Sequence, residues 1–165
     1  MDPDELANVF AIQQLKSRYF RCLDTKAWAQ WRRLFTDDLI FYVEDSALPG
    51  DSPPTQVGAD DFVSSVSETL QNAVTVHHGH MPEIELTGPD SARGVWAMYD
   101  WVDDAETGTA IQGWGHYHEL YRREADGEWR IAELRLTRLR VDVVAATRPG
   151  GDRPWPAPWK PEASA

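Results

Sequence analysis

The sequence predicts a single α+β domain in which N-terminal helices cover one face of a curved, mostly antiparallel sheet. In the first part of the chain, apolar residues recur at steps of three and four, the spacing of amphipathic helices. From residue 74 onward, runs rich in β-branched and aromatic residues are separated by short turn signals. Because the strands follow one another after the helices, this order favours α+β over an alternating α/β architecture. The 165 residues suffice for one domain with a sizeable core, which we expect to span residues 1–146.

Three segments carry helical patterns. The first spans residues 5–23, and either Asp2 or Asp4 can cap its N-terminus. A short second helix is expected over residues 26–35, and a third over residues 59–72. The buried side of the second helix is expected to consist of three aromatic residues: Trp28, Trp31 and Phe35.

Strand patterns fill most of the remaining sequence. A first strand is predicted over residues 39–44, and a loop rich in proline and glycine follows over residues 46–56. Four further strands are predicted, at residues 74–86, 92–103, 110–123 and 129–143. Short turn or loop signals separate them: Gly88-Pro89-Asp90, residues 104–109 and Asp126-Gly127. We therefore expect these four strands to form an antiparallel meander.

The C-terminal residues 147–165 form a separate segment. They contain five prolines and two tryptophans, so they cannot form a regular helix or a central strand. Because tryptophan favours burial, we expect this tail to drape over the body of the domain.

Composition narrows the classes of partner. Sixteen Lys and Arg against 27 Asp and Glu give a formal net charge of −11, which disfavours nucleic acid and anionic membrane surfaces. No apolar run approaches the ~20 residues of a transmembrane helix. The acidic N-terminus lacks the features of a secretory signal, so a cytoplasmic location is expected. Cys22 is the single cysteine, which excludes a disulfide within the chain.

Metal and cofactor motifs are weak or missing. The patterns GxSxG, GxGxxG and the P-loop do not occur. The run His77-His78-Gly79-His80 contains three imidazoles, but neighbouring side chains of a strand point to opposite faces, and no cysteine completes a ligand set. We therefore expect neither a metal nor a cofactor, and a hydrophobic small molecule as the partner.

The strand register brings two polar residues together. If the first hairpin turns at Gly88-Pro89, a symmetric antiparallel register places His77 opposite Asp100. A carboxylate beside an imidazole fixes its tautomer and raises its basicity, as a general base requires. A solvated surface pair is the alternative interpretation. However, the same face of the strand carries Trp96 and Met98, which is typical of a pocket and makes both residues candidate substrate contacts.

Local features affect this register and the pocket. Gly79 or Pro82 would introduce a bulge that moves the pairing by one residue. The alternating Gly113 and Gly115 indicate either sharp bending of the strand or close approach of a ligand. The residues that follow give two further candidate substrate contacts: His116 and Tyr117.

The opposite face of the strand that carries Asp100 is also apolar. It carries Val95, Ala97, Tyr99 and Trp101. The helices are needed on the first face, so another subunit is the simplest cover for the second. We therefore expect a homo-oligomer.

Three runs of residues carry a resemblance to a known family. They are Ile12 to Asp24, Val76 to Ile84, and Tyr121 to Ile131, which includes Asp126-Gly127-Glu128-Trp129. The chain resembles SnoaL-like proteins of the nuclear transport factor 2 superfamily, most closely the bile acid 7α-dehydratase group and more distantly scytalone dehydratase. The resemblance implies a cone-shaped sheet closed by helices around a deep apolar pocket, and it suggests a trimer. It also places four catalytic residues: Tyr19, Asp24, His77 and Asp100.

The expected function is a cofactor-independent dehydratase acting on a hydroxylated, carbonyl-bearing polycyclic substrate, either steroid- or bile-acid-like or a polyketide. His77 would remove a carbon-bound proton, with Asp100 or Asp24 orienting its ring. Tyr19 would donate a hydrogen bond to the enolate oxygen. The sequence leaves open which group protonates the leaving hydroxyl. The alternatives are an isomerase or a polyketide cyclase that uses the same residues, or a non-catalytic small-molecule-binding protein.

Overall fold

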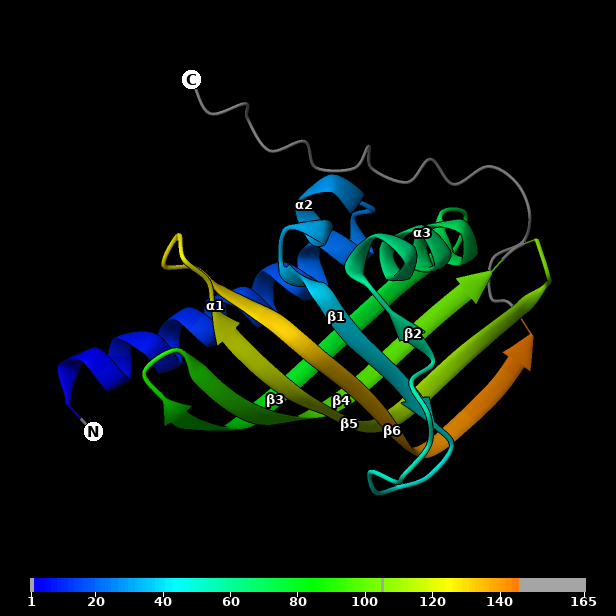
Figure 1. The fold of residues 1–165 in the computed structure, drawn as a ribbon. Helices are drawn as coiled ribbons and strands as arrows, with labels where there is room; N and C mark the ends of the chain where they lie inside the picture. Colours follow the sequence, from blue (N-terminus) through cyan, green and yellow to red (C-terminus); the bar gives the residue numbers. More distant parts are fainter. Residues whose placement is uncertain (1, 105, 146–165) are drawn as a thin grey trace.

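A computed structural model describes residues 2–104 and 106–145, and it contains three helices packed on a strongly curved six-stranded sheet (Figure 1). The helices are α1 (Pro3–Asp24), α2 (Trp28–Arg32) and α3 (Ala59–Leu70). The strands are β1 (Phe35–Glu44), β2 (Gln56–Val57), β3 (Val74–Gly88), β4 (Ser91–Asp104), β5 (Thr109–Arg123) and β6 (Trp129–Ala145). This arrangement confirms the predicted α+β fold. The tail predicted to drape over the domain lies outside the described residues.

The sheet has the strand order β2-β1-β6-β5-β4-β3. Strands β3 to β6 form the predicted antiparallel meander. The first long strand, β1, pairs with the last, β6, in parallel, and Phe41 lies opposite Leu134. The sheet is therefore mixed, and the β1–β6 pair joins the beginning of the domain to its end.

The ends of α1 follow from local chemistry. Asp2 caps the helix by accepting a hydrogen bond from the Glu5 amide, and the Glu5 carboxylate accepts one from the Asp2 amide, which forms a capping box. The second helix is shorter than predicted, because Lys26 adopts a positive φ of 59° that separates it from α1. The helical prediction for Phe35 was wrong. This residue begins β1, since the Leu34 carbonyl already accepts a hydrogen bond from the Ile131 amide of β6.

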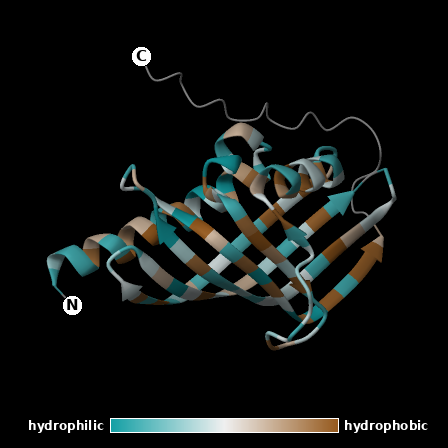
Figure 2. Cartoon of the chain, in the orientation of Figure 1, coloured by the Kyte–Doolittle hydropathy of each residue, from teal (hydrophilic) through white to brown (hydrophobic). Residues whose placement is uncertain are grey.

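The core lies between the concave face of the sheet and the helices. Polar and apolar residues alternate along the strands, as Figure 2 shows, so that each strand presents an apolar side to the interior. The Trp31 ring lies at the centre of an aromatic cluster, with the ring centroids of Phe35 and Phe62 at 5.0 and 5.2 Å. Cys22 is a buried free thiol in this core. Among the described helices, none is long and apolar enough to cross a bilayer.

The register of the first hairpin places His77 opposite Asp100, as predicted, although the turn lies at a different position than predicted. The hairpin turns at Pro89 and Asp90, because Gly88 pairs with Ser91. Two register shifts lie between the turn and His77, and together they offset the displaced turn. One of these shifts is a bulge between His80 and Glu83, the region where Pro82 suggested a bulge.

Candidate functional site

A cavity of about 320 Å³ lies between the concave face of the sheet and the three helices. Its wall is mostly apolar, with apolar side chains that come from every helix and from strands β1, β4 and β6: Leu23, Trp31, Phe41, Val43, Phe62, Val66, Leu70, Val102, Leu134 and Leu136. The polar lining consists of seven residues: Tyr19, Ser65, Thr69, His77, Asp100, Tyr117 and Arg138. A few polar groups in an apolar hollow are typical of a small-molecule site.

His77 is held by the end of helix α1. Its ring Nδ1 lies 2.7 Å from Asp24 Oδ1, and its backbone amide donates to Asp24 Oδ2 at 2.9 Å. The Thr75 hydroxyl also donates to Asp24 Oδ1, at 2.9 Å. Because a carboxylate only accepts, Nδ1 carries the proton and Nε2 carries the lone pair. Asp24 therefore orients His77, which resolves the choice between Asp24 and Asp100.

Asp100 has a different partner, Arg138 of β6. The guanidinium Nη1 lies 2.9 Å from Asp100 Oδ1 and 2.8 Å from Oδ2. Asp100 is 4% exposed, so this ion pair is shielded from water. Sequence reasoning did not find Arg138. Arg138 reaches Asp100 across the intervening strand β5, and a bulge between Trp114 and Gly115 changes the β5–β6 register next to it, so this contact is not readable from turn spacing.

The two glycines of β5 make room for different neighbours. A Cβ atom on Gly113 would lie 2.1 Å from Arg138 Nη1 and 2.2 Å from Asp100 Oδ1, so Gly113 leaves space for the ion pair. A Cβ atom on Gly115 would lie 1.8 Å from the Thr137 carbonyl oxygen, at the register shift. Gly113 thus leaves room for the ion pair of the site, and Gly115 permits the close approach of β5 and β6.

The Gly113→Ala variant is expected to displace the Asp100–Arg138 pair and to destabilise the fold by roughly 1–3 kcal/mol, because the added methyl group overlaps both side chains. Urea unfolding followed by circular dichroism measures the loss. Gly50→Ala is a matched control, since a Cβ atom there would lie 3.6 Å from Glu44 Oε2, an ordinary contact. A Gly113→Ala protein as stable as the wild type would contradict this account.

Two tyrosines complete the polar part of the cavity. Tyr19 and Tyr117 are 4% and 2% exposed, and their ring centroids are 6.1 Å apart. Burial raises the pKa of Tyr19 well above 10, and the charges of Glu119, Asp24 and Asp100 add to the effect. Burial also raises the pKa of Tyr117 well above 10. Both phenols therefore stay protonated and can donate a hydrogen bond to a ligand.

A buried charged network lies beside these tyrosines. Lys16 forms an ion pair with Glu119, and both side chains are 0% exposed. Glu119 also accepts a hydrogen bond from the Tyr121 hydroxyl, which itself accepts one from the Trp96 indole nitrogen at 2.8 Å. The Lys16 ammonium lies 3.7 Å from the Tyr117 ring centroid. The Lys16 end of this network thus packs against the tyrosine rings.

The predicted site residues divide into three groups. Tyr19, His77, Asp100 and Tyr117 line the cavity, whereas Asp24 lies behind His77. Trp96 and Met98 are buried on the same face but are not among the lining residues. The Trp96 indole is bound to Tyr121, and the Met98 sulfur packs 3.9 Å from Arg138 Nη1. Both side chains therefore contact polar groups next to the cavity, and their role as direct substrate contacts stays a prediction.

His116 lies on the opposite face of β5 from Tyr117, because side chains alternate along a strand. Its ring centroid is 6.1 Å from that of His118, on the outer face of the sheet. His116 therefore does not line the inner cavity, and its role as a substrate contact stays a prediction. His78 likewise faces outward, with its ring edge-on to that of His80, as strand alternation predicted.

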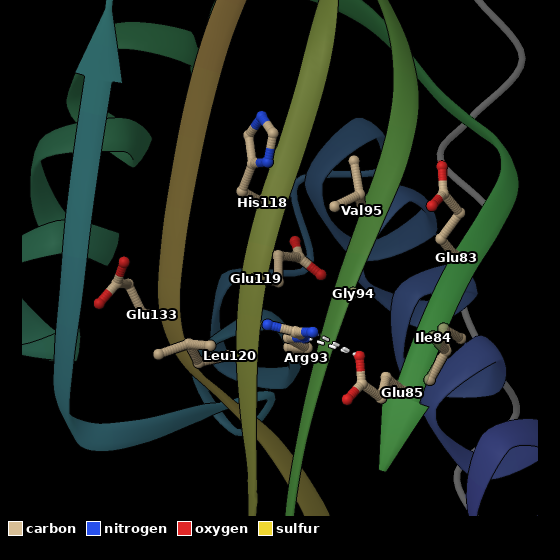
Figure 3. Close-up of a pocket in the computed structure, with 10 residues that line it drawn as sticks. All are labelled: Glu83, Ile84, Glu85, Arg93, Gly94, Val95, His118, Glu119, Leu120 and Glu133. Carbon is tan, nitrogen blue, oxygen red and sulfur yellow. Dashed lines mark hydrogen bonds and ion pairs between the residues drawn. The ribbon is translucent and has the colours of Figure 1, made fainter. Parts of the chain in front are cut away.

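A second hollow, of about 500 Å³, lies on the outer face of β3 to β6 (Figure 3). Its charged residues do not converge: Glu85 is paired with Arg93, and Glu83 and Glu133 lie on opposite sides in Figure 3. In the part of the chain that the structure describes, no group of three His, Cys, Asp or Glu residues is arranged to hold a metal ion. The inner cavity is therefore the better candidate site.

The SnoaL-like domain family model matches residues 4–135, from the first turn of α1 into β6. The chain belongs to the SnoaL-like domain family. This match covers helix α1 with Tyr19 and Asp24 and the strands with His77 and Asp100. It confirms the resemblance on which those positions were predicted, at the level of the family.

Solved structures share this SnoaL-like fold. A type 2 hexachlorocyclohexane dehydrochlorinase, LinA, has a TM-score of 0.75 and 21% identity, covering 92% of this chain and 100% of that chain. A candidate scytalone dehydratase from Novosphingobium aromaticivorans has a TM-score of 0.73 and 18% identity, covering 93% and 100%. The type 3 LinA dehydrochlorinase from Novosphingobium barchaimii has a TM-score of 0.72 and 22% identity, covering 92% and 100%. At these identities the likeness establishes the fold of this chain.

Proposed function

We propose that this SnoaL-like protein is a cofactor-independent lyase that eliminates water from a hydroxylated, carbonyl-bearing polycyclic substrate, steroid-like or polyketide-like. The observation that carries the proposal is the His77–Asp24 pair, which presents an imidazole to an apolar cavity that also holds two phenols and a guanidinium. This set combines a base, donors for an oxyanion and a cation for a leaving group.

In the proposed first step, His77 Nε2 removes a proton from the carbon next to the substrate carbonyl. The Asp24 carboxylate stabilises the imidazolium that forms, because it already binds Nδ1 at 2.7 Å. Tyr19 and Tyr117 donate hydrogen bonds to the developing enolate oxygen. One such donor in a dry site contributes about 3 kcal/mol to the transition state.

In the second step, the enolate expels the hydroxyl group, and the electron pair of the broken C–O bond leaves with the oxygen. Arg138 stabilises this oxygen with a guanidinium that Asp100 holds in place. The proton on His77 then passes to the leaving hydroxide, so that water is released and His77 returns to its neutral form. In this scheme Asp100 acts through Arg138, and His77 serves both as base and as acid.

The names of the structural neighbours support elimination as the reaction class. A dehydrochlorinase removes hydrogen chloride and a dehydratase removes water, and both eliminations take a proton from carbon. The cavity of about 320 Å³ lies near the lower end of the roughly 300–1,000 Å³ range of ligand pockets, which suits a compact fused-ring substrate.

An ultraviolet assay tests this function. The purified protein is mixed with a panel of hydroxy-ketosteroids and polyketide ketones, and the absorbance of a newly extended conjugated carbonyl is followed. A signal that depends on the protein supports elimination and identifies the responding scaffold. Ligand binding without any new chromophore would favour the alternatives, an isomerase or cyclase that uses the same enolate, or a binding protein.

We also propose that the protein is a homo-oligomer, with a trimer as the first expectation from the family. The outer face of the sheet carries a partly exposed aromatic row, in which the Tyr99 and Trp114 ring centroids are 5.6 Å apart. Light scattering after size exclusion should give a multiple of 18.7 kDa. Trp114→Lys should lower that mass, whereas Leu48→Lys, on an exposed loop, should not. A monomeric wild-type protein would contradict the proposal.

A further inference from the structure

Lys26 occupies a backbone position that usually favours glycine. After the end of α1, the Lys26 amide donates to the Leu23 carbonyl at 3.2 Å, and the Ala27 amide donates to the Cys22 carbonyl at 2.8 Å. These two hydrogen bonds form a Schellman motif, in which Lys26 is the left-handed residue with φ 59°. A residue with a Cβ atom is strained here, so a lysine at this position costs stability that glycine would not.

The Lys26 side chain reaches the candidate base through a chain of hydrogen bonds. Its Nζ donates to Thr75 Oγ1 at 2.8 Å, and Thr75 Oγ1 donates to Asp24 Oδ1 at 2.9 Å. Asp24 Oδ1 then accepts from His77 Nδ1 at 2.7 Å. Thr75 is 4% exposed and Lys26 is half-buried, so most of this chain is protected from water.

The direction of these hydrogen bonds follows from the Lys26 ammonium, which is the first donor. An ammonium group can only donate, so Thr75 Oγ1 accepts from Lys26 and must turn its own hydrogen toward Asp24. Asp24 Oδ1, as a carboxylate oxygen, accepts from both Thr75 and His77. The proton of the imidazole is placed on Nδ1, and Nε2 is left free for the substrate.

We propose that Lys26 is a positioning residue for the base: acting through Thr75, it holds the Asp24 carboxylate that binds Nδ1 of His77. The cation also offsets part of the attraction of Asp24 for an imidazolium. The catalytic benefit of the hydrogen bonds from Lys26 rests on the proposed function. Their effect on the His77 ring does not depend on that function.

The electrostatics of Lys26 agree with this role. Burial lowers the pKa of Lys26 to about 8, and the Asp24 charge opposes that effect. The ammonium is therefore charged at neutral pH, and a neutral amine, which can also accept, replaces it at alkaline pH. Four other titratable groups line the cavity with His77: Tyr19 on α1, Asp100 on β4, Tyr117 on β5 and Arg138 on β6.

Nitrogen NMR of the five histidines, with His77→Asn to assign the signal, tests the proposal without any substrate. In the wild type, the neutral His77 ring should carry its proton on Nδ1. Lys26→Met should raise the pH of half-protonation of His77 by about half a unit or more, because the cation that offsets the Asp24 charge is removed. Lys26→Arg, which keeps a donor-only cation, should preserve the wild-type signals. Arg18→Gln removes an exposed cation from the same helix and should leave them unchanged.

Two further variants keep the test independent of folding. Lys26→Gly relieves the strained backbone, so its Tm should stay within about 4 °C of the wild type while the His77 signals change as in Lys26→Met. Thr75→Val removes the hydroxyl that links Lys26 to Asp24 and should shift the His77 titration in the same direction. Folded Lys26→Gly and Lys26→Met proteins with wild-type His77 titration would overturn the proposal. If the NMR changes occur but no substrate is turned over, the proposed function fails while the role of Lys26 stands.

Discussion

The His77→Asn variant is expected to lose about 10²–10⁴-fold in kcat, the range that a positioned general base contributes. Asparagine can still hydrogen-bond to Asp24 but cannot take up a proton at the substrate carbon. Because the fold of β3 does not depend on the imidazole, the variant should keep its Tm and its affinity for substrate. Steady-state kinetics on the scaffold that responds in the ultraviolet assay measure the loss.

His78→Asn is the matched control, since His78 is the next residue on the strand and its side chain is exposed on the opposite face. It should retain wild-type turnover. Turnover of His77→Asn within about threefold of the wild type would show that His77 is not the base. A protein that only binds its ligand would show no turnover in the wild type and unchanged affinity in the variant.

The Lys16→Met variant is expected to lose about 3–5 kcal/mol of unfolding free energy, because it leaves the Glu119 carboxylate buried without its counter-ion. The Tyr121 hydroxyl would remain as a hydrogen-bond donor to Glu119, but it carries no charge. Burial lowers the pKa of Lys16, with Glu119 acting in the opposite direction, so the ammonium depends on its partner. Urea unfolding followed by circular dichroism measures the change.

The double variant Lys16→Met with Glu119→Leu separates the loss of the pair from the loss of packing. Replacing both members of a buried ion pair by apolar residues of similar size is often neutral or stabilising. The double variant should therefore be more stable than Lys16→Met alone. An Arg93→Met variant, which removes a cation from an exposed ion pair with Glu85, should change stability by less than about 1 kcal/mol. Equal stabilities of Lys16→Met and the wild type would contradict the assigned role of Lys16.

Local interactions explain which features were predictable. The cap at Asp2, the alternation along the strands and the order of helices before strands depend on neighbours in the sequence, and all three are found. The His77–Asp100 register was also predicted, although a displaced turn and two register shifts compensated for each other. His116 does not line the cavity because its strand neighbour Tyr117 faces inward, and sequence periodicity did not fix which of the two would do so.

The sequence by itself determined the fold class, the antiparallel meander and, through the family resemblance, three of the residues that meet in the cavity. Tertiary structure decided which polar groups pair. Asp24 binds His77 across 53 residues, and Arg138 binds Asp100 across 38 residues. The parallel β1–β6 pair likewise joins distant segments. The physical reason is that these contacts depend on where α1 ends against the sheet and on bulges that move a strand by one residue. Turn and periodicity signals, in contrast, act only between near neighbours in the sequence.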